Sequence, residues 1–452
     1  MNCRTNLHES SAPSARSALS GFEFHLLAFS ASPRLCGEKA TRGAATIQLL
    51  VILVPVLFGL IGFAVDLGMI YSMKGELKAG AAAMALAGAQ QLIGTDSSTT
   101  AAATAMSVTS NNYYFQRFPI GQGSGTRIST ISDPVYYATA ADAIANGVGG
   151  AAGAQARYVR VSVTGQMPPL FWGFLPLLTS TRNITVAATA VAGVSAPLCL
   201  ACGIEPIAVA ALNQSDTTDF GFTQNIEYSL SYLCTGGTPP PVLAGASQTI
   251  YYVLLNRFDP SATVFPDEGS QAFQYAAGGL PGTISNSACP AGQSCACFRV
   301  NNTESLWTDA TVNTCGTVAS LVTSTLCGLD ARFESSPANA CSNIQAVDTL
   351  STIYTPDTDV NPYGTYNSYT GNGRRVVTIP IVDMLSSSGT MTVLGFRQFL
   401  LIPQQTPPPY IDPSNSYGSF AALYIGSVVP VPQGRFDGCQ QTAGPGKVVL
   451  HQ

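Results

Sequence analysis

The sequence predicts an α+β protein in which a single N-terminal transmembrane helix extends into an alanine-rich helix, followed by a largely β, disulfide-stapled extracytoplasmic region. Three observations support this class. Residues 47–65 form one apolar run. Alanine, which has the highest helix propensity, dominates the segment 79–89. Beyond residue 111, alternating apolar stretches lie between Gly, Pro, Asn and Ser turns, and ten of the twelve cysteines lie there too.

The apolar run IQLLVILVPVLFGLIGFAV has the length of a membrane span. Its residues extend about 28 Å at ~1.5 Å each, close to the ~30 Å hydrocarbon thickness. A buried core helix and a cleaved signal peptide, whose apolar core is usually ~7–15 residues, are the alternatives. We expect an uncleaved anchor that contacts the lipid bilayer. Arg34, Lys39 and Arg42 precede the run and Lys74 and Lys78 follow it, which favours a cytoplasmic N-terminus.

These features divide the chain into five expected segments. A short cytoplasmic tail covers residues 1–43, the transmembrane helix covers 44–70, and an Ala-rich helical stem covers 71–110. A first β-rich region over 111–195 and a β-rich, cysteine-containing outer domain over 196–452 follow. Turn signals between the strands of the outer region are typical of a β-sandwich-like or meander architecture.

Asp66 comes directly after the apolar run, where a carboxylate costs much less than at the centre of a bilayer. It either marks the membrane boundary or makes an assembly contact with another helix. The following helix has an apolar stripe and two ladders of small residues that allow close packing. The stripe contains Met69, Met73, Leu77 and Met84, and the ladders are Ala81, Ala85, Ala89 and Ala79, Ala83, Ala87.

The composition excludes several functional classes. Charged residues make up 10% of the chain and the net charge is −5, so there is no basic surface for a nucleic acid. The histidines are His8, His25 and His451, so the body of the chain lacks the imidazole that common nucleophilic triads and zinc sites use. These absences argue against most common hydrolase, metalloprotease and nucleotide-dependent chemistries and leave carboxylate-only chemistry open. We expect no catalytic residue, no cofactor and no enzymatic activity.

The downstream cysteines form an even set in a region of low charge, which indicates disulfides in an oxidising compartment. Scattered reduced cysteines are the alternative, and a redox motif at Cys199-Leu-Ala-Cys202 is another. The spacing does not determine the pairing. The disulfide candidates are Cys199, Cys202, Cys234, Cys289, Cys295, Cys297, Cys315, Cys327, Cys341 and Cys439.

One stretch has the oxygen spacing of a calcium loop. Asp357, Asp359 and Asn361 occupy positions one, three and five, but Pro362 stands where such a loop needs glycine and Ser368 where it needs glutamate. The alternative to calcium binding is a turn. We expect no other metal site.

Residues 43–92 resemble the N-terminal module of the TadG-like proteins of tight-adherence (Tad, or Flp) pilus assembly. That module has an apolar span, a V-D-x-G sequence at its end and an alanine-rich helix. Val65, Asp66 and Gly68 match the V-D-x-G, and Leu77 with Ala81 to Ala89 matches the helix. The family usually has LQ and an aspartate in this helix, and both are absent here.

The resemblance implies a single-pass protein of the bacterial inner (cytoplasmic) membrane with its large domain outside the cytoplasm. Its expected role is non-catalytic assembly or anchoring of a Tad/Flp-type pilus, and its expected partners are other pilus-assembly membrane proteins or pilins. A membrane-anchored surface adhesin is the alternative, and an extracytoplasmic carboxylate-dependent hydrolase is a further one.

Overall fold

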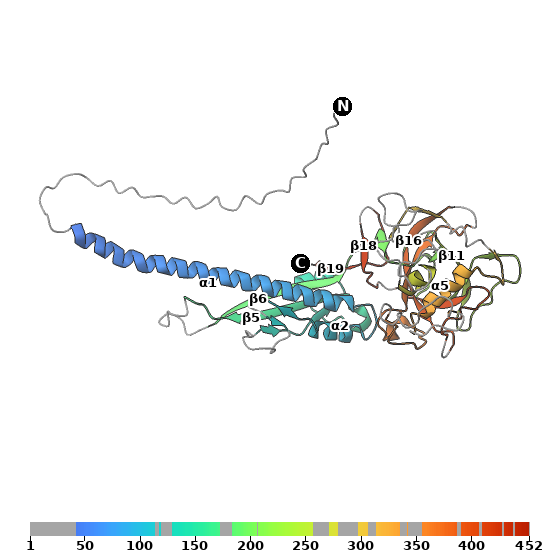
Figure 1. Ribbon diagram of the computed structural model, residues 1–452, viewed down its shortest axis with the longest axis horizontal. Coiled ribbons are helices and arrows are strands. Elements are labelled where there is room, and N and C mark those ends of the chain that lie inside the picture. The colour runs from blue at the N-terminus through green and yellow to red at the C-terminus, as the bar shows by residue number, and fades with distance from the viewer. Residues whose placement is uncertain are drawn as a thin grey trace, which may run out of the picture. The chain divides into compact units, whose positions relative to one another are not determined.

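A computed structural model (Figure 1) gives the structure of most of the chain beyond residue 41. The described residues are 42–113, 117–118, 129–171, 183–205, 207–255, 271–278, 297–305, 313–334, 341, 355–386, 390–405, 409–426, 429–436 and 439–451. Cys289 and Cys295 lie outside these ranges. The chain divides into two compact units, Met1–Ile61 and Gly62–Gln452.

The described chain begins with one long helix, and shorter helices follow later. The α-helices are α1 (Arg42–Gln90), α2 (Ser98–Ser107), α3 (Ala140–Ala145), α4 (Gln271–Gly278) and α5 (Ser320–Asp330), with 3₁₀ turns at η1 (Gly153–Gln155) and η4 (Tyr366–Ser368). The expected transmembrane helix and the first part of the expected stem, up to Gln90, are thus parts of one helix, α1, while α2 occupies the later part of that stem. The described part of the first unit consists of the N-terminal portion of α1.

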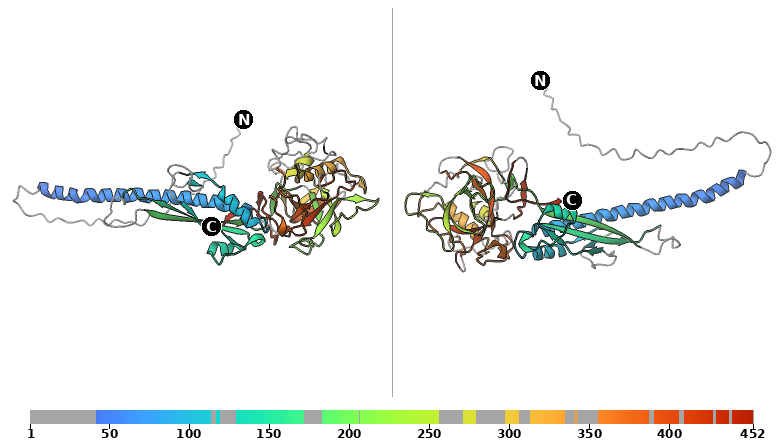
Figure 2. Two further views of the ribbon diagram at one scale, coloured as in Figure 1. Left: turned by 90° about the horizontal axis from the view of Figure 1, so that it is seen from below. Right: turned by 180° about the vertical axis from the view of Figure 1, so that it is seen from behind.

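A five-stranded antiparallel sheet lies beside the C-terminal half of α1, as Figures 1 and 2 show for its long strands β5 and β6. Its last strand comes from the C-terminal end of the described chain and pairs with β6. The strands are β19 (Val448–His451), β6 (Ile184–Val194), β5 (Tyr158–Met167), β3 (Ser129–Ile131) and β4 (Val135–Tyr137), where β4 pairs with β5.

The predicted apolar stripe of α1 forms the core between this helix and the sheet. Met73, Leu77 and Ala81 are fully buried in one cluster with Val159 and Val161 of β5. Val159 and Val161 belong to an alternating strand whose other face is more exposed, which is the pattern of a sheet covered on one side. The small residues of α1 therefore allow close packing of a helix on a sheet.

The outer region contains a closed six-stranded barrel with mixed strand directions. Its strands follow the order β16 (Thr390–Ile402), β15 (Val376–Val382), β8 (Ile207–Ala210), β11 (Gln248–Leu254), β9 (Glu227–Tyr232) and β17 (Phe420–Tyr424). The barrel closes because residues Phe399 to Ile402 of β16 pair with β17 along one edge, while β16 pairs with β15 along the other. The expected sandwich or meander is therefore wrong, since β9–β11 and β8–β15 are parallel pairs that hairpins cannot form.

Shorter strands surround the barrel. β13 (Thr303–Ser305) extends the barrel sheet at β16, and β12 (Cys297–Arg299), β7 (Leu200–Cys202) and β18 (Gln433–Arg435) form a small sheet. Two-stranded pairs join β10 (Cys234–Thr235) to β14 (Asn313–Thr314) and β1 (Asn111–Asn112) to β2 (Arg117–Phe118). The fold class predicted from the sequence is confirmed: an apolar N-terminal helix precedes a largely β region joined by disulfides.

Candidate functional site

The N-terminal part of α1 has the properties of a membrane span. The stretch of α1 from Thr46 to Gln90 is long and apolar enough to cross a membrane. Its large side chains face outward, for example Ile52 at 69% and Phe58 at 65% exposure. Such exposure of a continuous apolar surface fits contact with lipid, since a water-soluble core helix would bury these side chains. The expected single-pass membrane helix is consistent with this geometry.

Asp66 is buried at the end of that span, with 3% of its surface exposed. Its Oδ1 accepts hydrogen bonds from the backbone N–H groups of Leu170, at 2.9 Å, and Phe171, at 3.3 Å. Its Oδ2 accepts a second contact from the Phe171 N–H at 3.2 Å. The carboxylate therefore holds the segment that follows β5 against α1. This intramolecular role was not anticipated from the sequence, and the assembly contact stays a prediction.

The segment bound by Asp66 has few backbone N–H donors. Pro168 and Pro169 follow the end of β5 and have no N–H group, so Leu170 and Phe171 carry the only two donors of residues 168–171. Both donate to Asp66. The consecutive prolines Pro168 and Pro169 were the sequence signal that could have identified these two donors.

Next to Asp66 lies an apolar hollow of about 190 Å³. Phe63, Leu67 and Ile70 of α1 line it together with Ile184 at the start of β6. A hollow with these walls suits an apolar occupant, because water needs several polar partners to remain in such a space. Asp66, its two bound amides and this hollow form the candidate site, which we call the boundary site.

The cysteines that the structure describes beyond residue 198 form disulfides, as the sequence predicted. The pairs are Cys199–Cys439, Cys202–Cys297, Cys234–Cys315 and Cys327–Cys341. Cys199 and Cys202 bond to different distant partners, so the alternative of a redox motif at this pair is wrong. The predicted pairing state of Cys289 and Cys295 falls outside the described residues.

Asp357 and Asp359 organise a hydrogen-bonded turn. The two oxygens of Asp357 accept the N–H groups of Asp359 and Arg375, at 2.9 and 3.0 Å. Asp359 accepts the Asn361 N–H at 2.9 Å and the hydroxyls of Thr370 and Tyr363. Burial alone would raise the pKa of Asp359, but these hydrogen bonds lower its pKa to about 2.

These contacts favour the turn over the calcium loop for Asp357, Asp359 and Asn361. The carboxylate oxygens that a calcium ion would need already accept hydrogen bonds from the chain itself, and Asn361 also donates its side-chain N–H to Asp359. Throughout the part of the chain that the structure describes, no group of three or more His, Cys, Asp or Glu side chains could hold a metal ion.

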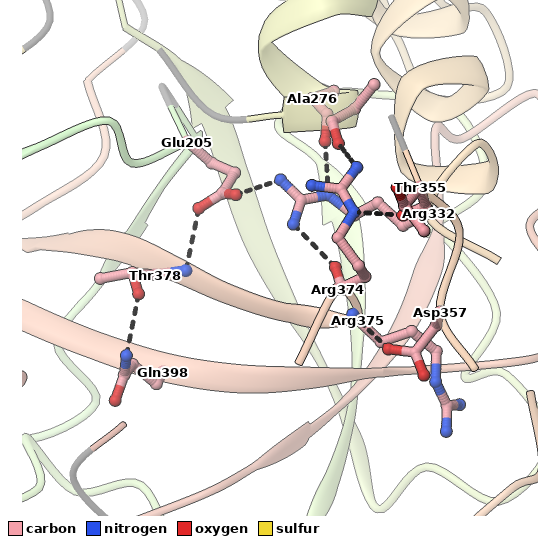
Figure 3. A network of polar contacts seen from close by, with 10 residues as sticks. Glu205, Ala276, Arg332, Thr355, Asp357, Arg374, Arg375, Thr378 and Gln398 are labelled. Carbon is pink, nitrogen blue, oxygen red and sulfur yellow. Dashed lines mark hydrogen bonds and ion pairs between the residues drawn. The ribbon is translucent and has the colours of Figure 1, made fainter. Parts of the chain in front are cut away.

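A buried ion pair joins the barrel to its covering helices (Figure 3). Glu205, just before β8, accepts from the Arg332 guanidinium, just after α5. Arg332 also donates to the backbone oxygens of Ala276 in α4 and Arg374 before β15, at 2.6 and 2.9 Å, while the Thr378 N–H of β15 donates to Glu205 at 2.8 Å. Burial raises the pKa of Glu205, and Arg332 opposes that shift. Neither residue carried a sequence signal for this role.

Arg375, next to that network, is buried within a group of aromatic rings. Its guanidinium lies 5.2 to 5.8 Å from the ring centres of Phe333, Tyr363 and Tyr369, and its Nη1 donates to the Asn361 backbone oxygen at 3.1 Å. Arg375 and the ion pair thus link residues Arg332 and Phe333, just after α5, to the start of β15.

Comparison with known proteins identifies the N-terminal helix. Residues 43–91 match the family described as putative Flp pilus-assembly TadE/G-like. No curated protein and no solved structure matches the chain. The matched residues coincide with α1, which contains the apolar span, Asp66 and the alanine-rich stem. The chain therefore carries a TadE/G-like module of Flp pilus assembly at its N-terminus, as the resemblance predicted.

Proposed function

We propose that this chain anchors or assembles a Tad/Flp-type pilus from the bacterial inner membrane, with its N-terminus in the cytoplasm and its barrel outside, and that it does so without catalysis. The observation that carries the proposal is the family match over residues 43–91, which ends one residue after α1 ends at Gln90. The matched module thus includes both the membrane span and the stem that packs on the β5–β6 sheet.

The continuity of α1 supports the proposed anchoring role. One continuous helix runs from the apolar span to the buried stem residues Leu77 and Ala81, so the stem sheet is connected to the span without an intervening loop. Disulfides join segments of the outer region beside the barrel strands, and disulfides form and persist in oxidising compartments. The partners of this role would be other pilus-assembly membrane proteins or pilins.

Deletion and complementation test this function. Deleting the gene should remove surface pili in electron micrographs, and the full chain should restore them. A secreted variant that lacks residues 42–61 should not restore them, because its stem and barrel lose the connection to the membrane. Normal pili together with lost attachment to surfaces would instead support the adhesin, and would contradict the assembly role.

Orientation needs a separate experiment. In spheroplasts, external protease should degrade the barrel and leave the N-terminal tail protected. Alkylation of intact cells followed by gel electrophoresis should show Cys234 and Cys315 blocked by their disulfide. Free thiols at both positions in living cells would place the barrel in the cytoplasm and contradict the proposed topology.

A further inference from the structure

We propose that Leu170 and Phe171, at the end of β5, make a second contact with the lipid bilayer beside the span of α1, and that Asp66 supports this contact by accepting their two N–H groups. The proposal depends on the membrane span and is independent of the pilus role. It assigns a lipid partner to a β-strand end that the family match, residues 43–91, does not include.

The depth of Phe171 follows from its contact with Gly62. A Cβ atom added to Gly62 would lie 2.7 Å from the Phe171 Cβ, so the two residues are in direct contact. Gly62 precedes Val65, the last residue of the apolar run, by three positions, or ~4.5 Å along the helix axis. The Cβ atom of Phe171, which carries the ring, therefore lies beside a residue of the apolar run.

The side chains of this strand end are exposed where lipid would be. Leu170 is 54% exposed and Phe171 is 44% exposed. Phe63 and Leu67 of α1, which line the apolar hollow, are exposed by 50% and 38%. These exposed apolar side chains belong to residues that lie at Gly62 or Asp66, at the end of the apolar run. Acyl chains can fill the hollow beside Asp66.

The backbone N–H groups of the same segment have the partners that an apolar environment requires. Unsatisfied N–H groups cost several kcal/mol in hydrocarbon, so non-helical backbone is tolerated there only when its donors find partners. Pro168 and Pro169 have no donor, and the donors of Leu170 and Phe171 both reach Asp66. A carboxylate can accept both at once, which explains why an acidic residue stands at this position.

Lipid is favoured over a protein partner as the occupant. Phe171 contacts Gly62, which belongs to the apolar run of its own chain, and the sequence has no charged residue between Phe171 and Arg182. A segment of this composition is typical of membrane interfaces, where aromatic side chains are enriched.

Photo-crosslinking of the full-length protein tests the contact. The photoreactive analogue p-benzoylphenylalanine replaces Phe171 in one variant and Phe436 in a matched control, whose phenylalanine is 54% exposed near the outer region. Both are reconstituted in vesicles of phosphatidylethanolamine and phosphatidylglycerol, irradiated and analysed by peptide mass spectrometry. We expect a phospholipid adduct at position 171 and none at 436. The same probe at Leu170 guards against a local defect caused by the first replacement.

Two results would overturn the proposal. Absence of lipid adducts at both 170 and 171 would show that this end lies in water. Adducts to another protein chain in place of lipid would assign the surface to a protein partner. For the role of Asp66, the Asp66→Ala change should lower the lipid adduct at 171 several-fold while the Cys234–Cys315 disulfide still forms. An unchanged yield would refute the part played by the carboxylate.

Discussion

Loss of the guanidinium of Arg332 should destabilise the barrel strongly. Arg332 is 3% exposed and Glu205 is 4% exposed, so Arg332→Met leaves a buried carboxylate without its cationic partner. Breaking a buried pair in this way costs about 3–5 kcal/mol. The backbone oxygens of Ala276 and Arg374 lose their donors as well. Because ordinary domains are stable by only about 5–15 kcal/mol, the change should remove a large part of the total.

The assay is urea unfolding of the full chain in detergent micelles, with the transition midpoint and slope followed by fluorescence. A second variant, Arg332→Met combined with Glu205→Gln, serves as the control, since it removes both charges. We expect the double variant to be more stable than Arg332→Met alone, because the uncompensated buried charge is the main cost. Equal instability of the two would show that lost packing or backbone contacts dominate, and would refute this explanation.

The penalty should also depend on pH. Burial raises the folded-state pKa of Glu205 above its usual value of 4.5, and removing Arg332 eliminates an opposing interaction. A carboxyl whose pKa is raised by folding binds its proton more tightly in the folded state. The variant should therefore approach wild-type stability below pH 4.5 and lose stability as pH rises through the folded-state pKa of Glu205. A penalty that is constant with pH would contradict the charge argument.

Three further predictions concern other parts of the chain. Asp66→Ala should expose the two amides that it binds to exchange, so hydrogen–deuterium exchange at the end of β5 should accelerate at least tenfold, and Asp66→Asn, which keeps one acceptor, should have a smaller effect. Burial raises the pKa of Asp330 to about 7 from 3.8, so its charging should cost roughly 4 kcal/mol of stability as pH rises from 4 to 8. Asp330→Asn should remove that slope in unfolding experiments, and a slope that persists would assign it to another group. Cys234→Ser with Cys315→Ser opens a link between residues 81 apart, so the free energy of unfolding should fall by about 4–5 kcal/mol, and a fall below 1 kcal/mol would contradict the chain-entropy estimate.

The strands of the stem sheet were predictable from local pattern. Alternating apolar stretches beyond residue 111 predicted strands, and the structure has β5 at Tyr158–Met167, within which residues 158–164 alternate, and β6 at Ile184–Val194. For β5 the reason is that one face packs on α1 and the other is more exposed, so its sequence alternates. The stripe of α1 was predictable for the same reason, because one side of that helix covers the sheet.

The barrel was not predictable in the same way. Stretches 249–255, 375–381 and 390–396 are among the apolar stretches that lie between turn residues, and they correspond to β11, β15 and β16. Alternation tells which side chains face a core, but it does not tell which strand edges pair. Closure depends on the pairing of β16 with both β15 and β17. No local sequence pattern shows that one strand pairs along both of its edges in this way.

By itself, the sequence determined that an apolar helix leads into an alanine-rich stem, that cysteines stabilise a charge-poor β region, and that Asp66 ends the span. Each is a property of composition or short-range period, which a linear chain displays directly. Only the tertiary structure decided which cysteines pair, how the barrel closes and what Asp66 binds. The Leu170 and Phe171 amides lie more than a hundred residues away in sequence, and folding of β5 against α1 brings them to its carboxylate.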